Sequence, residues 1–257
     1  MRFISLCLLA VVSLLSSCAE FNELTRDVDP FFPVKTAPSQ KDTATALRQA
    51  LEQGVQTAIG RLGQYDGFLQ NQEARIPLPS QLDTAAEMLR QLGQQRFVTE
   101  FTTSMNRAAE QAVPVAREIF TETIRTMSLG DAVEIVQGNN TAATDYFRHR
   151  NEKDILRAFR PLVEQATRDV GVTDNYKQLI TRLGPLSGML DEDMRDIDQY
   201  ITQKAADAVF RFIAKEEQAI RENPVQRTTA LMKEVFKYYT GSRSEAPEID
   251  IPASPAR

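Results

Sequence analysis

The chain has few of the residues from which many active sites are built. Its 257 residues include one histidine, His149, and two cysteines, Cys7 and Cys18. A single histidine cannot form a histidine metal site and leaves at most one candidate base for a catalytic triad. Because His149 stands between Arg148 and Arg150 in an expected helix, we expect it to be exposed. Neither cysteine lies beyond residue 18, so the body has no thiol for a disulfide framework or a cysteine metal site.

Other absences narrow the function further. The sequence contains no GxSxG, GxGxxG or GxxxxGK motif, and we expect neither a cofactor nor a metal. Its 30 basic residues are outnumbered by 35 acidic residues, and they form no basic stripe. Nucleic acid and anionic lipids are therefore disfavoured as partners.

The N-terminus lacks an apolar run long enough to span a membrane. After Arg2 the run from Phe3 to Leu15 falls short of the roughly 20 residues that a spanning helix needs. It ends in Leu15-Ser16-Ser17-Cys18, which resembles the signal of bacterial lipoproteins. The resemblance implies that residues 1–17 are a signal peptide and that the Cys18 thiol receives a diacylglyceryl group.

The expected lipidation of Cys18 indicates where the protein is located. A single acyl chain holds a protein only marginally, whereas two or three chains on one cysteine anchor it firmly to the membrane. Residue 19 is alanine and not aspartate, which resembles lipoproteins that are sent to the outer membrane. We therefore expect a lipid-anchored protein of the bacterial envelope, on the outer membrane and facing the periplasm.

The segments on either side of the body lack helical periodicity. Residues 18–42 carry Pro30, Pro33 and Pro38 and are interpreted as a lipidated tether, although three phenylalanines leave open that part of it docks on the body. Residues 240–257 carry three prolines and are expected to be disordered. Residues 43–239 then form the folded domain.

No segment alternates apolar and polar residues as a strand does, and helical spacing recurs throughout the body. The fold class is therefore all-α, a compact multi-helix bundle. Helices are expected over Leu47–Leu62, Leu82–Leu92, Phe97–Phe120 as a kinked pair around Pro114, Ala132–Val136, residues 142–170, a short segment after Thr173, a long helix from Asp196 to Glu222, and Thr228–Tyr239.

Several motifs resemble one family of bacterial lipoproteins. They are Gly67-Phe68-Leu69, Arg75-Ile76-Pro77-Leu78-Pro79, Met105 to Glu110, Ala142 to Phe147, and Glu216 to Thr229. The family is catalogued as domain of unknown function 4197, and the resemblance covers about residues 44 to 237. It implies a fold class and an envelope location, and no activity.

One acidic residue is expected inside an apolar face. At 100° per residue, Glu216 falls within the apolar arc of the helix that follows Asp196, while Glu217 points about 100° away toward the polar face. A carboxylate there needs a partner, which Arg75, Arg107 or Arg227 could supply. The pair would be either a structural ion pair or part of a ligand or catalytic site.

A polar cleft between helices is a second hypothesis. Three polar residues lie off the apolar arc of their helix: Asn106, Arg107 and Glu110. They form either a solvated face or the lining of a cleft. The prolines after Arg75 could hold its segment extended, so that Arg75 lines the same cleft. In addition, residues 138–141 could offer backbone N–H groups to an anion, or simply form a loop and a cap. The candidate cleft comprises Arg75, Asn106, Arg107, Glu110, Glu216, Arg221 and Arg227.

Two classes of function follow. The first is a non-enzymatic binding or structural protein, held at the membrane by the lipid on Cys18, with a periplasmic protein, a cell-wall component or a small amphiphile as its partner. The alternative is a carboxylate-dependent hydrolase or transferase that uses Glu216 or Glu110 on an anionic envelope substrate.

Overall fold

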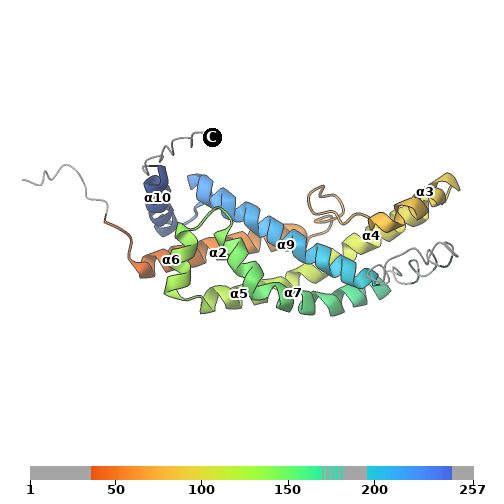
Figure 1. Ribbon diagram of the computed structural model, residues 1–257, viewed down its shortest axis with the longest axis horizontal. Coiled ribbons are helices and arrows are strands. Elements are labelled where there is room, and N and C mark those ends of the chain that lie inside the picture. The colour runs from red at the N-terminus through yellow and green to blue at the C-terminus, as the bar shows by residue number, and fades with distance from the viewer. Residues whose placement is uncertain are drawn as a thin grey trace, which may run out of the picture. The chain divides into compact units, whose positions relative to one another are not determined.

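A computed structural model describes residues 36–169, residues 171, 174, 176, 178 and 181, and residues 196–244, without the side chains of residues 81, 85 and 242–244. Every regular element in this part of the chain is helical. In chain order they are α2 (Gln40–Leu62), η2 (Ser80–Leu82), α3 (Asp83–Gln91), α4 (Gln95–Ala112), η3 (Val113–Val115), α5 (Ala116–Thr126), α6 (Leu129–Gln137), α7 (Ala142–Asp169), α9 (Ile197–Glu222), η6 (Pro224–Gln226) and α10 (Ala230–Ser244). The all-α prediction is confirmed (Figure 1).

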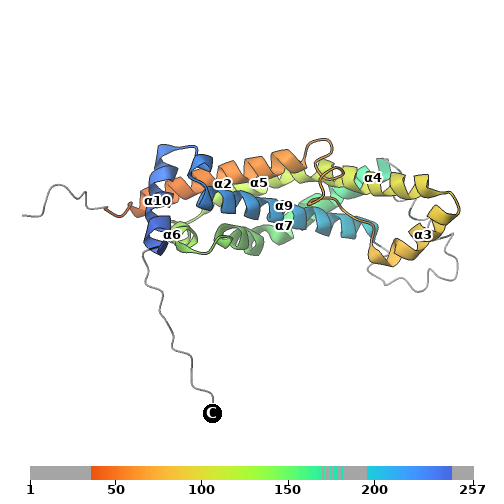
Figure 2. The same ribbon diagram turned by 90° about the horizontal axis from the view of Figure 1, so that it is seen from above.

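The central helix of the bundle is α9. It packs against α7 on one side and α2 on another, and also contacts α4. Figure 2 shows α2, α9 and α7 running side by side. Buried residues therefore recur along α9 from Ile197 to Ile220, while the opposite face remains exposed at Lys204, Arg211 and Lys215.

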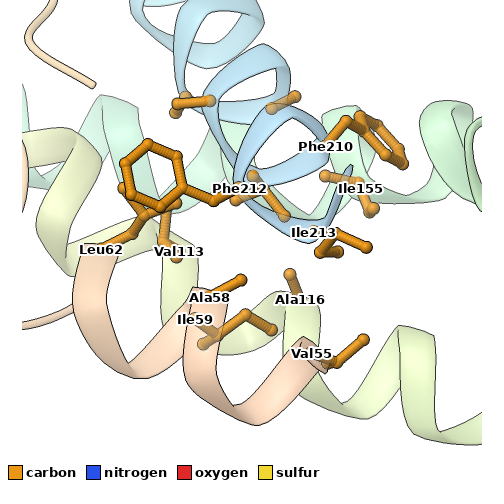
Figure 3. Close-up of a cluster of buried hydrophobic side chains, with 14 of the residues drawn as sticks. Val55, Ala58, Ile59, Leu62, Val113, Ala116, Ile155, Phe210, Phe212 and Ile213 are labelled. Atoms are coloured by element: carbon orange, nitrogen blue, oxygen red, sulfur yellow. The ribbon is translucent and has the colours of Figure 1, made fainter. Parts of the chain in front are cut away.

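One cluster of core side chains lies where α2, α5, α7 and α9 meet (Figure 3). Ile59 of α2, Ala116 of α5, Ile155 of α7 and Ile213 of α9 are all buried there. Burying one such large aliphatic side chain contributes about 1.5–3 kcal/mol, so this cluster holds the four helices together.

Proline 114 bends the chain without reversing it, as predicted. Helix α4 ends at Ala112, Pro114 lies in the 3-10 turn η3, and α5 continues in the same general direction (Figure 1). Proline has no N–H to donate into the helical ladder, and the tighter turn accommodates this loss.

Most predicted helix ends are also confirmed. Ser128 and Asp131 form a capping box at the start of α6, which Gly138 closes. The Asp196 carboxylate caps α9 by accepting a hydrogen bond from Gln199 N–H. Gly63 closes α2.

Helices extend beyond both ends of the expected domain, residues 43–239. Helix α2 begins at Gln40, inside the segment assigned to the tether, because Ser39 Oγ accepts a hydrogen bond from Asp42 N–H and caps it. Helix α10 continues to Ser244, so the expected disordered tail begins as helix.

Several predictions fall outside the described residues. They are the signal peptide, Cys18 and most of the tether, the short helix after Thr173 apart from scattered positions, and the tail beyond Ser244. Among the described helices, none is both long and apolar enough to cross a membrane.

Candidate functional site

Glu110 anchors the loop that follows α2. Its Oε1 accepts hydrogen bonds from the N–H groups of Phe68, at 3.0 Å, and Leu69, at 3.2 Å. Its Oε2 accepts one from Nη1 of Arg107 at 2.6 Å. Both oxygens of this buried carboxylate are therefore engaged in holding the loop on α4.

Arg107 extends the same network to the surface. Its Nη2 donates to Asp66 Oδ1 at 2.7 Å, and its guanidinium lies 3.5 Å from the ring centroid of Tyr65. Burial alone would lower the pKa of Arg107, but the hydrogen bonds to Glu110 and Asp66 raise it overall. The network stabilises a tight turn in which Asp66 adopts a positive φ of 64°.

The Asn106 side chain binds the backbone of the next part of the loop, at Ile76. Its Oδ1 accepts from Ile76 N–H at 2.8 Å, and its Nδ2 donates to the carbonyls of Ile76, at 3.0 Å, and Thr102, at 2.8 Å. Asn106 is fully buried, so these hydrogen bonds compensate for its desolvation. The Asn106, Arg107 and Glu110 triplet is a loop anchor.

Arg75 belongs to the same loop but not to the anchor. It is exposed and forms no ion pair with any residue that the structure describes. Its neighbour Ile76, by contrast, is buried. Arg75 projects from the loop, as expected, but it does not share a cleft with Asn106, Arg107 and Glu110.

The buried carboxylate of α9 is Glu217, which we expected on the polar face. Glu216 pairs with an arginine, as expected, but the partner is Arg61 and not Arg75, Arg107 or Arg227. The Glu216 side chain retains 13 % of its exposure and binds Arg61, a surface residue of α2, at 2.8 Å. Glu217, expected on the polar face, has a side chain only 5 % exposed. The helical wheel missed this because α7 covers the face of α9 that would otherwise meet solvent.

Glu217 caps the N-terminus of α7. Its oxygens accept hydrogen bonds from the N–H groups of Ala143 and Thr144, both at 2.9 Å, and from the Thr144 hydroxyl at 2.8 Å. The free N–H groups of a helix start favour an anion there. We considered an anion site in residues 138–141, but the N–H groups that bind the carboxylate follow that segment, and the Thr141 N–H donates to Asn139 Oδ1 instead.

Arg221 joins Glu217 to the end of α6. Its Nε and Nη2 donate to Glu217 Oε1 at 3.0 and 2.9 Å. Its Nη2 and Nη1 also donate to the carbonyls of Ile135, at 2.8 Å, and Val136, at 3.1 Å, in the last turn of α6. One ion pair therefore caps the end of α6 and the start of α7.

Arg227 has no such partner. It is 3 % exposed, and its Nε and Nη2 donate to the carbonyls of Ile220 and Arg221 at 3.0 and 2.7 Å. Its guanidinium carbon lies 5.6 Å from the ring centroid of Phe236. No carboxylate within the described residues pairs with Arg227, and burial lowers its pKa.

Arg221 and Arg227 line a groove of about 910 Å³ beside α10. Helix α10 crosses near the C-terminal end of α9 and α6, and contacts α2 (Figures 1 and 2). The remaining lining residues come from the ends of α6 and α9, the turn before α7, η6 and α10. They are Val136, Asn140, Glu222, Pro224, Val225, Lys233, Phe236, Lys237, Tyr239 and Thr240.

The candidate residues therefore fall into separate places and not into one cleft. The loop anchor lies at the C-terminal end of α2, where Gly67 packs on Leu62. Arg221 instead packs near Leu47 and Leu51, in the first half of α2. At about 1.5 Å per residue, these two positions on α2 are roughly 20 Å apart.

Sequence reasoning found Arg221 and Arg227 but missed the rest of the groove. Lys233, Lys237 and Thr240 follow one another at helical spacing on α10, a signal that was present in the sequence. His149 is exposed, as expected, and lies outside the groove.

Comparison with known proteins identifies the family and nothing closer. No curated protein matches the chain, and no solved structure matches it. A family model described as "Protein of unknown function (DUF4197)" matches residues 37–237, which include the bundle, the loop anchor and most of the groove. The chain belongs to the DUF4197 family.

Proposed function

We propose that this chain is a lipid-anchored protein of the bacterial cell envelope that binds a ligand in the groove beside α10 without catalysing a reaction. The observation that carries the binding function is Arg227, a buried cation that lines an open groove and has no carboxylate partner in the described part of the chain. A buried charge left without a counterion is costly, which favours an anion arriving from outside.

The location rests on the sequence. The segment from Arg2 to Cys18 has the charge, apolar run and cysteine of a lipoprotein signal, and Ala19 favours the outer membrane. The lipid would hold the body on the periplasmic face of that membrane. A periplasmic protein, a cell-wall component or a small amphiphile would be within its reach.

The alternative, a carboxylate-dependent hydrolase or transferase, has little support in the geometry. A general acid or base must reach its substrate and exchange a proton with it. Glu110 binds two backbone N–H groups and Arg107, and Glu216 binds Arg61 at the edge of the bundle. These contacts commit both candidates to structural roles.

Membrane fractionation tests the anchor. We expect the exported Cys18→Ser variant to move from the membrane to the soluble periplasmic fraction and to lose incorporation of labelled palmitate. Cys7→Ser is the matched control, because it removes the other cysteine and leaves Cys18 for lipidation. A Cys18→Ser protein that still sediments with membranes would refute lipid anchoring at Cys18.

A further inference from the structure

The charge of the groove is opposite to that of the chain. The whole chain has a formal net charge of −5, yet four cations and a single carboxylate, Glu222, line the groove. Glu222 accepts hydrogen bonds from Asn140, at 3.1 Å, and Gln218, at 2.9 Å. Arg221 is paired with Glu217. The other three cations have no carboxylate within 4.0 Å in the described part of the chain; they are Arg227, Lys233 and Lys237.

Arg227 has a donor left over. Its Nε and Nη2 bind the last carbonyls of α9, while Nη1 has no hydrogen-bond acceptor among the described residues. Because Arg227 lines the groove, a ligand there could reach this donor. An anionic oxygen in the groove would accept a hydrogen bond from Nη1 and offset the cost of desolvating the guanidinium.

The rest of the groove suits an apolar group. Phe236 and Val136 are buried side chains whose edges line it, and Pro224 lies beside them. Val225 is 84 % exposed on η6, with its apolar surface unused by the core. A ligand that combines an anion with an apolar body would use both kinds of surface.

The size of the groove favours a small molecule over a protein. Small-molecule sites typically enclose about 300–1,000 Å³, a range that includes the 910 Å³ found here. A stable protein partner would need roughly 800 Å² on each side, spread well beyond the residues that line this groove.

We propose that the groove binds a single-chain amphiphile with an anionic head group, a phosphate or carboxylate. The head group binds Arg227 between Lys233 and Lys237, and the acyl chain lies against Phe236, Val136 and Val225. This assignment rests on the proposed binding function and names its ligand class. Lipid anchoring would hold the groove beside a source of such molecules.

Calorimetric titration with dodecyl phosphate, below its micelle concentration, tests the proposal. The protein is the exported full chain with Cys18→Ser, which removes the proposed lipid. We expect saturable binding at one site that weakens as salt is raised, because part of the affinity is electrostatic. Inorganic phosphate tests the head group alone, and dodecyl maltoside tests the chain without a charge; both should bind much more weakly.

Charge-removing variants locate the site. Lys233→Gln with Lys237→Gln should weaken binding roughly five- to tenfold without disturbing the fold, because both side chains are exposed. Lys153→Gln, an exposed lysine of α7 outside the groove, is the matched control and should bind as the parent does. Arg227→Gln should weaken binding roughly ten- to hundredfold. Arg227 also caps α9, so the circular dichroism spectrum of this variant must match that of the parent to show that the fold is intact.

The proposal is overturned if dodecyl phosphate does not bind, if dodecyl maltoside or inorganic phosphate binds equally well, or if the double lysine variant binds as the control does. None of these outcomes bears on Cys18. A protein that fractionates with membranes through Cys18 but ignores dodecyl phosphate would retain the proposed location and lose only this ligand.

Discussion

Glu217 and Arg221 lie one turn apart on α9, and Nη2 of Arg221 is 2.9 Å from Oε1 of Glu217. The carboxylate caps the start of α7, and the guanidinium caps the end of α6. Each charge has the sign that stabilises the helix end it meets. The pair thereby fixes the α6–α7 turn on α9, and this turn is one wall of the groove.

Removing the carboxylate of this pair should be costly. Glu217→Ala leaves a buried guanidinium and two N–H groups of α7 without their acceptor, so we expect a loss of about 3–5 kcal/mol in the free energy of unfolding. Glu217→Gln should cost less than the alanine variant, since one oxygen remains as an acceptor. Urea melts of the full chain measure both.

Glu216→Ala is the control for that experiment. It removes an ion pair with Arg61, whose side chain is 60 % exposed, so the loss should stay within about 1 kcal/mol. Equal losses for Glu216→Ala and Glu217→Ala would contradict the assignment of Glu217 as the structural carboxylate.

The loop anchor depends on a close backbone contact at Gly67. A Cβ atom there would lie 2.4 Å from the carbonyl oxygens of Arg61 and Leu62, and neither backbone group can move away freely. We expect Gly67→Ala to destabilise the protein by about 1–3 kcal/mol. Thermal unfolding followed by circular dichroism gives the difference.

Gly60→Ala should stabilise the protein. Gly60 lies within α2, and a Cβ atom there meets nothing within 4 Å. Alanine favours the helix over glycine by about 0.5–1 kcal/mol, so this variant should melt at a higher temperature. A Gly67→Ala protein as stable as Gly60→Ala would show that the loop is not held as described.

Two aspartates at the start of α9 should give opposite pH effects. Burial raises the pKa of Asp198, despite the hydrogen bond from Thr167. The folded state then keeps a proton that the unfolded state loses, so its contribution to stability falls as pH rises above the ordinary aspartate range. Asp198→Asn should therefore be more stable than the parent at pH 7, with the gain shrinking below about pH 4.

Asp196 provides the contrast. Burial would raise its pKa, but the hydrogen bonds from Arg160 and Gln199 lower it overall. The stability that it contributes is present above the ordinary aspartate range and is lost as pH falls through its lowered pKa. Asp196→Asn should lower stability at pH 7 and converge with the parent in acid. Chemical denaturation from pH 3 to 8 tests both variants, and pH profiles of the same sign would contradict the shifts.

Local signals in the sequence predicted the fold well. Ser128, Asp196 and Pro114 act within one helical turn, so their effects do not depend on what packs nearby. The family resemblance, over about residues 44 to 237, agrees closely with the matched span of 37–237.

The site could not be predicted in the same way, because its contacts join distant segments. An ideal wheel places Glu216 in the apolar arc, but α9 meets α2 there beside Gly54, whose missing side chain leaves room for the stem of Glu216 to reach Arg61. Glu217 is buried by the start of α7, 73 residues earlier in the chain. Neither fact is contained in the periodicity of α9 alone.

The Arg227 side chain has both a structural role and a place in the groove. It holds the final carbonyls of α9 and also lines the groove, so exchanging it to suit a different ligand would loosen the helix end as well. Lys233 and Lys237 carry no such structural load in the described part of the chain. If the groove binds the proposed amphiphile and relatives within the family accept different head groups, we expect the sequence differences at these two lysine positions and a constant arginine.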